Sequence, residues 1–179
     1  MKDIVNMDNE TSVFALIRSH MLEGLMFHDQ MYNAFLFLRL YRFAKDHKNH
    51  YKEENKAFKK LNKYYITHRN KLIEETQLDF SNSVIQPEMY DKTRFDMSDE
   101  DIKNFVIYLI DSWVDWERKS KELYTEGYNK LIEYGFAPES EIIMDLVKDV
   151  DNELADAESL QLELEAMKYD VIEIMKMNE

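Results

Sequence analysis

The feature that most constrains this chain is a set of four long segments in which apolar residues recur at helical spacing. Its 179 residues include only three glycines and two prolines. An all-β fold needs many more turn residues than these, so the sequence indicates a helical protein. The chain is long enough to form one domain with a substantial core, and we expect that domain to cover residues 1–179. The spacing predicts helices over about 12–46, 50–76, 98–134 and 139–177.

Several residues mark where these helices begin and end. Ser98 and Asp101 have the spacing of a capping box, which predicts a helix start at Ser98. Gly135 is placed to end that helix, and Pro138 suits the first turn of the next one. No residue between 139 and 177 is expected to break the last helix.

The connections between the helices predict the topology. A few polar residues around Lys48 join the first two helices, and Phe136 and Ala137 join the last two, so each pair forms an antiparallel hairpin. The segment 77–97 between the pairs, extended at about 3.3 Å per residue, reaches more than about 60 Å. That exceeds the roughly 55 Å length of the third helix. The sequence therefore predicts an all-α four-helix bundle whose two hairpins are joined by a long crossover, which is the ferritin-like connectivity.

Composition narrows the classes of function. The chain has no cysteine, which excludes disulfides, thiolate metal sites and cysteine nucleophiles. Its formal net charge of −13 disfavours direct binding of nucleic acid and suits a cation site or a partner protein with a basic surface. The start of the chain lacks the apolar run of a signal peptide, and no apolar stretch is long enough to span a bilayer. We therefore expect a cytoplasmic protein without a membrane segment, and the sequence leaves its oligomeric state open, a homo-oligomer included.

Local sequence adds a family resemblance. The stretch MYNAFLFLRLYRFA is similar to the first helix of ferritins, and WERKSKELYTEGYNKL followed by IIMDLVKDVDNELADAE is similar to their third and fourth helices. The chain thus resembles the ferritin-like superfamily over nearly its whole length. It also resembles a group of uncharacterised proteins from Firmicutes and their phages, through the segments FHDQM, YYITHRNKLI and TRFDM.

The family's metal-binding motif is degenerate in this sequence. Di-iron sites of the superfamily use a glutamate from each of two helices and Glu-x-x-His from each of the other two. The chain contains no Glu-x-x-His, and no histidine follows His68. This departure argues against a standard di-iron centre and against the ferroxidase or oxygenase chemistry that the resemblance implies.

Four polar residues nevertheless interrupt the apolar stripes at similar depths. With a turn near Lys48, His28 and His68 each lie about twenty residues from the first hairpin turn, roughly 30 Å along the helix. Glu117 and Glu153 are predicted near the middle of the bundle by the same reasoning. The set His28, His68, Glu117 and Glu153 could therefore bind Fe, Mn or Zn through nitrogen and oxygen ligands. The alternative is simpler: two buried His–Glu pairs that satisfy each other, as the relic of a lost site.

A second group of residues could also bind a metal, but the sequence places it away from the bundle core. His47, His50 and Glu53 fall near the predicted first turn, so we expect them at an exposed position where any metal binding is adventitious.

Acidic residues also lie along the predicted fourth helix and would form a surface for a basic partner protein. They are Asp145, Asp149, Asp151, Glu158 and Glu163.

Two functional hypotheses follow from these features. The first is a non-enzymatic, acidic protein-binding module, in its concrete form a phage or mobile-element protein that inhibits a host nucleic-acid-binding or defence enzyme, as anti-CRISPR proteins do. The second is a ferritin-like metal-binding protein with a reduced His/Glu site in the bundle core. The sequence favours the first, because the missing Glu-x-x-His motifs weaken the second.

Overall fold

The computed structural model describes residues 7–73 and 92–178, and within these ranges all regular structure is helical. None of the helices in this part of the chain is both long and apolar enough to cross a membrane. The elements are α1 (Glu10–Leu38), α2 (Tyr41–Arg69), the 3₁₀ turn η3 (Arg94–Asp96), α3 (Asp99–Glu133), α4 (Ala137–Ala166) and α5 (Val171–Met177).

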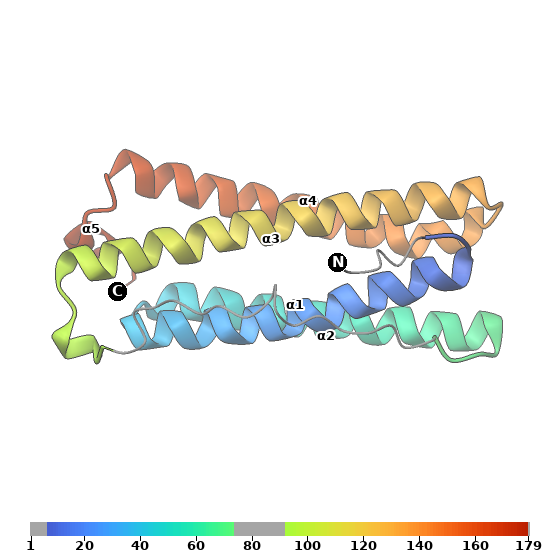
Figure 1. Cartoon of the computed structure of the whole chain (residues 1–179), viewed down its shortest axis with the longest axis horizontal. Coiled ribbons are helices and arrows are strands. Elements are labelled where there is room, and N and C mark those ends of the chain that lie inside the picture. The colour runs from blue at the N-terminus through green and yellow to red at the C-terminus, as the bar shows by residue number, and fades with distance from the viewer. Residues whose placement is uncertain (1–6, 74–91, 179) are drawn as a thin grey trace.

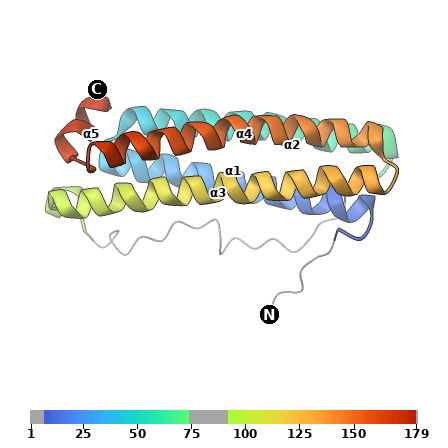
Figure 2. The same ribbon diagram turned by 90° about the horizontal axis from the view of Figure 1, so that it is seen from above.

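The four long helices form an elongated bundle, which confirms the predicted all-α architecture (Figure 1). α1 packs on α2, α3 packs on α4, and α1 packs on α3. α2 and α3 run in the same direction, each antiparallel to its hairpin partner (Figure 1). The view from above places α1 and α3 on one side of the bundle and α2 and α4 on the other (Figure 2). The predicted crossover 77–97 lies mostly outside the described residues.

The first hairpin turn lies at Arg39 and Leu40, so the predicted boundaries 12–46 and 50–76 are wrong there. Arg39 adopts a left-handed conformation, with φ of 64°. Its N–H donates to the Leu36 carbonyl at 3.0 Å, and the Leu40 N–H donates to the Phe35 carbonyl at 2.8 Å. These bonds satisfy the last carbonyls of α1 and reverse the chain without glycine or proline. The turn therefore carries none of the usual sequence signals.

The helix ends of the second hairpin lie where the sequence predicts them. The Ser98 side chain accepts a hydrogen bond from the Asp101 N–H, and the Asp101 carboxylate accepts one from the Ser98 N–H, which confirms the predicted capping box. Gly135 has φ of 81° after the end of α3, a conformation that favours glycine. Pro138 lies in the first turn of α4.

The last predicted helix is interrupted, contrary to expectation. α4 ends at Ala166 because Lys168 and Tyr169 both have positive φ, at 55° and 53°. Tyr169 is buried at this corner, and Asp170 then caps α5 by accepting hydrogen bonds from two backbone N–H groups. The chain turns back so that Asn178 accepts a hydrogen bond from the Phe43 N–H in the first turn of α2, at 3.1 Å.

Two apolar clusters fill the bundle. One surrounds Phe35, Leu109 and Trp113 near the first turn and α5, and the other surrounds Phe14 and Tyr65 toward the opposite end. The helices present polar side chains at the level where the two clusters meet. This polar layer is the candidate functional site.

Candidate metal centre

The position of the first turn decides which histidines meet. His28 lies about 16 Å before that turn, and His50 lies about 15 Å after it, at 1.5 Å per residue. The rings of His28 and His50 have centroids 5.4 Å apart. His68 lies near the other end of α2, exposed, with its Nδ1 2.9 Å from the Tyr64 carbonyl. The predicted pairing of His28 with His68 is therefore wrong, because it assumed a turn near Lys48.

The same correction applies to the histidines expected at an exposed turn. His47 is 1 % exposed and His50 is largely buried, because both lie well inside α2. Glu53 is exposed at the edge of the site. The ligand atoms of His50, Glu53 and Glu153 lie within 4.8 Å of one another.

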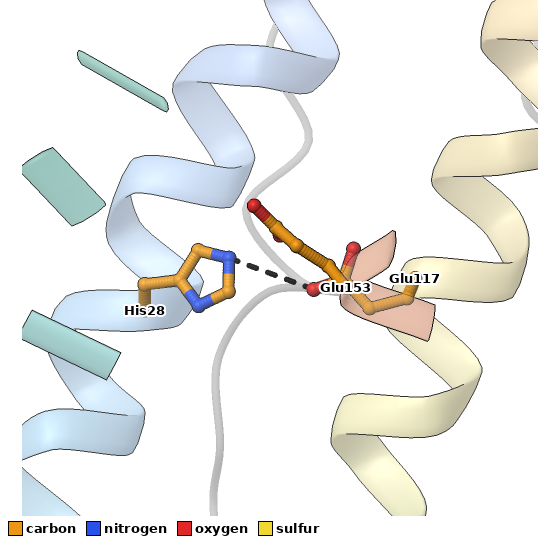
Figure 3. A group of neighbouring side chains, drawn as sticks. All are labelled: His28, Glu117 and Glu153. Atoms are coloured by element: carbon orange, nitrogen blue, oxygen red, sulfur yellow. Dashed lines mark ion pairs between the residues drawn. The ribbon is translucent and has the colours of Figure 1, made fainter. Parts of the chain in front are cut away.

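The structure brings together three of the four predicted ligands. His28 on α1, Glu117 on α3 and Glu153 on α4 offer ligand atoms within 4.8 Å of one another (Figure 3). His28 Nε2 lies 3.7 Å from Glu117 Oε1, and both side chains are 2 % exposed. Glu153 is the residue that this group shares with His50 and Glu53. The site thus consists of two neighbouring groups that meet at one carboxylate.

Sequence reasoning missed one member of the site, Glu54 on α2. Its Oε2 lies 3.9 Å from His28 Nε2 and, although buried, has no hydrogen-bond partner among the described residues. Glu54 reaches this position because Gly24 on α1 has no side chain, and a Cβ there would meet the Glu54 carboxyl group. The stripe of α2 contains Glu54 at helical spacing, but only the correct turn aligns it with His28.

An outer layer of side chains orients the ligands. The Trp113 indole N–H donates to Glu117 Oε1 at 3.0 Å. His47 Nδ1 lies 3.2 Å from His28 Nδ1, and since one of these nitrogens must carry the proton, the pair shares a single N–H. When His28 donates, its Nε2 keeps a lone pair directed at Glu117 and Glu54. This is the tautomer that binds a metal through Nε2.

Burial disfavours the charged forms of the central carboxyl groups. Burial raises the pKa of Glu54 well above its usual range, and the neighbouring Glu117 and Glu153 raise it further. Burial likewise raises the pKa of Glu117, with a further contribution from Glu153 that outweighs the Trp113 hydrogen bond. Burial therefore favours the protonated forms of these two carboxyl groups.

The pKa values of the histidines shift in opposite directions. Burial lowers the pKa of His28 to about 3, and it lowers the pKa of His47 well below the usual value. Burial also acts to lower the pKa of His50, but Glu153, Glu53 and Asp46 outweigh it and the pKa is raised. His28 and His47 are thus neutral at pH 7, as metal ligation and its support require.

A cavity of about 330 Å³ adjoins the site between α2 and α4. Its walls include Glu53 and Glu54 of α2 and Asp149 and Glu153 of α4, while Tyr124 of α3 lies deeper. Glu53 and Asp149 are exposed, so the cavity opens to solvent between α2 and α4, which make few close contacts with each other. Solvent and small solutes have a route to the site from this side.

The acids expected to contact a partner have several roles in the structure. Three of them form ion pairs within the bundle: Asp145 with Lys60 at 2.8 Å, Asp151 with Lys121 at 2.7 Å, and Glu158 with Arg118 at 3.1 Å. Asp149 lines the cavity beside the site, and Glu163 lines a second cavity next to it. The acidic surface of α4 is thus partly paired with lysine and arginine.

Comparisons with known protein families, with curated proteins and with solved structures find no match to this chain. The functional argument therefore depends on the geometry of the site.

Proposed function

We propose that the chain is a metal-binding protein that holds two divalent transition-metal ions in the polar layer of its bundle. One ion would be held by His28, Glu54 and Glu117, the other by His50 and Glu53, with Glu153 shared between them. The observation that carries this proposal is the buried, unpartnered Oε2 of Glu54, which faces the neutral Nε2 of His28 at 3.9 Å.

The ligand spacing fits a cation better than a hydrogen-bond network. The distances of 3.7 and 3.9 Å from His28 Nε2 to the two carboxylates exceed those of hydrogen bonds. Two ligands that each bind a metal at about 2.1 Å are at most about 4.2 Å apart, so the observed separations suit a shared ion. The alternative expectation, two buried His–Glu pairs that satisfy each other, leaves the Glu54 oxygen without a partner.

The charge of the carboxyl groups supports the binding of two ions. Four carboxyl groups surround the site, and as carboxylates they would balance two divalent cations. A mixture of imidazole and carboxylate ligands suits iron, manganese or zinc, and the excess of carboxylates favours iron or manganese. Such ions would supply Lewis acidity and, for iron or manganese, redox chemistry at the site.

The chain's own groups prepare the site for binding. His47 holds the His28 ring through Nδ1, and the Trp113 indole N–H donates to Glu117 Oε1, the oxygen that faces His28. Burial raises the pKa of the Glu54 and Glu117 carboxyl groups, so the incoming cations replace protons there. The opening between α2 and α4 admits the ions and water.

Calorimetric titration of chelated protein with Mn²⁺, anaerobic Fe²⁺ and Zn²⁺ tests the proposal. We expect saturation at about two ions per chain for at least one of these metals. Glu54→Gln keeps the volume of the side chain and removes its charge, and it should weaken binding by at least about tenfold. Glu158→Gln, on an exposed face of α4, is the matched control and should bind as the wild type does. Equal affinity for all three proteins would refute the assignment.

The protein-binding hypothesis stays a prediction. Three of its five acids already have basic partners within the chain, so the geometry favours the metal centre. If α4 binds a basic partner, reversing the charge at Asp151 and Glu158 must weaken that complex, and high salt must weaken it too.

A further inference from the structure

A second cavity, of about 390 Å³, continues the opening between α2 and α4 toward α5. His50 and Asp156 line both cavities, so the second one adjoins the metal centre. Its inner wall is aromatic, with Phe35, Phe43 and Trp113 all at most 5 % exposed. An apolar, concave wall of this kind is typical of sites for small organic molecules.

The rim of this cavity is predominantly acidic. Asp46, Asp156 and Glu163 line it, and their carboxylates form no hydrogen bond or ion pair with another described residue. Arg42 is the one basic side chain besides the histidines, and it donates to the Met177 carbonyl at 3.3 Å. Three carboxylates against one guanidinium favour a cationic guest.

A buried histidine also lines the second cavity. His47 is 1 % exposed and lines the second cavity. Its Nδ1 lies 3.2 Å from His28 Nδ1, so only Nε2 remains for a bond to another group. His47 thus adds a polar group to the aromatic wall of this cavity.

We infer that the second cavity binds a small organic amine. Its ammonium group would lie among Asp46, Asp156 and Glu163, and its carbon skeleton would lie on the aromatic wall formed by Phe35, Phe43 and Trp113. Carboxylates supply the charge attraction, and the faces of aromatic rings add to it. Aliphatic or aromatic primary amines a few carbons long match the cavity in both size and charge.

The position of the cavity beside His50 would bring the amine's carbon skeleton toward the metal centre. Binding of the amine does not need the metal, whereas a role for the amine as a substrate of the centre rests on the proposed function. The two claims are therefore tested on different forms of the protein.

Benzylamine is the probe, compared with benzoate and benzyl alcohol, which have the same ring with negative and no charge. Calorimetry on chelated protein at pH 7 and low ionic strength should show saturable binding of one benzylamine per chain. Benzoate should bind at least about tenfold more weakly, since its charge is opposed by the rim. Repeating the titration on metal-loaded protein shows whether the centre alters the affinity.

Variants locate the amine. Glu163→Gln and Asp46→Asn should each weaken benzylamine binding about three- to tenfold, and Glu163→Gln should leave metal binding unchanged. Glu165→Gln, exposed on the same helix and outside both cavities, is the control. Leu160→Trp should fill the cavity and abolish binding, and Ser159→Trp blocks it from an exposed position if the first variant does not fold.

Benzylamine that fails to saturate, benzoate that binds equally well, or a folded Leu160→Trp or Ser159→Trp variant that keeps full affinity would each overturn the inference. Amine binding without metal binding would overturn the proposed function and leave the amine site intact. Metal binding without amine binding would overturn the inference of an amine site and leave the proposed function intact.

Discussion

Gly24 on α1 faces the carboxyl group of Glu54 on α2, and a Cβ at position 24 would come within 2.7 Å of the Glu54 carboxyl carbon. Glycine in a helix interior normally costs about 1 kcal/mol relative to alanine. Here it provides the space through which Glu54 reaches His28. The absence of a side chain at one position thus places an ionisable group in the core.

Gly24→Ala separates this role from helix stability. The added methyl group meets the end of a flexible side chain, so we expect the fold to survive with a free energy of unfolding within about 1 kcal/mol of the wild type. The displaced Glu54 carboxylate should lower metal affinity by at least about tenfold in calorimetric titration. The double variant Gly24→Ala/Glu54→Asp, in which residue 54 has a shorter side chain, tests whether the contact between the added methyl group and the Glu54 carboxyl group causes this loss. Unchanged metal affinity in Gly24→Ala would show that Glu54 is not a ligand.

His47 is predicted to act through His28. His47→Phe keeps a ring between Phe35 and Trp113 but removes the 3.2 Å contact with His28 Nδ1. Metal affinity should fall about 10- to 100-fold, the usual effect of removing a partner of a metal-bound histidine. His68→Phe is the matched control, because the structure places His68 far from the site, and it should bind metal normally. Equal losses in the two variants would contradict the placement of the turn at Arg39.

Glu153 and Glu53 should differ in the number of ions they affect. Glu153 belongs to both ligand groups, whereas Glu53 belongs to the more exposed group only. Glu153→Gln should therefore weaken both binding events, and Glu53→Gln should weaken one and leave the other near its wild-type affinity. Stoichiometry from titration followed by elemental analysis separates these outcomes. Two equally weakened events in Glu53→Gln would argue against two distinct positions.

His20, which lies outside the metal centre, should make the free energy of unfolding depend on pH. It stacks on Trp116 at 4.5 Å and donates to Ser120 Oγ at 2.7 Å, and burial, helped by Lys119, lowers its pKa to about 4. Between pH 6.5 and about 4 the unfolded chain binds this proton and the folded chain does not, so stability falls as the pH falls. The loss should reach about 2–3 kcal/mol relative to His20→Phe, measured by urea unfolding at pH 7 and pH 4. Parallel pH dependence in the two proteins would show that His20 does not carry this effect.

The sequence predicts the helices and their order because periodicity and caps are local properties. The capping box at Ser98 and the glycine at 135 are examples, and the structure confirms both. The turn at Arg39 escapes prediction because a non-glycine residue adopts positive φ inside an apolar run that also suits a continuous helix. Asp170 with Glu173 three residues later does signal a new helix start, and the break before α5 could have been found from it.

The candidate site depends on long-range register, which makes it harder to predict. The sequence places Glu117 and Glu153 at the same level because the turn of their hairpin is marked by Gly135, and the structure brings the two together. The sequence places the first turn about eight residues too late, and for this reason it predicts His68, instead of His50 and Glu54, as the partner of His28. A helical hairpin aligns residues at equal distances from its turn, so a misplaced turn changes every partner along it.

The most direct test of the central claim is the metal content of the tag-free protein after anaerobic loading with Fe²⁺ or Mn²⁺ and exhaustive dialysis, measured beside His28→Ala/Glu117→Gln. We predict about two ions per wild-type chain and a clear loss in the folded double variant. A wild-type protein that retains no more metal than the double variant would contradict the account and leave the polar layer as a buried hydrogen-bonding network.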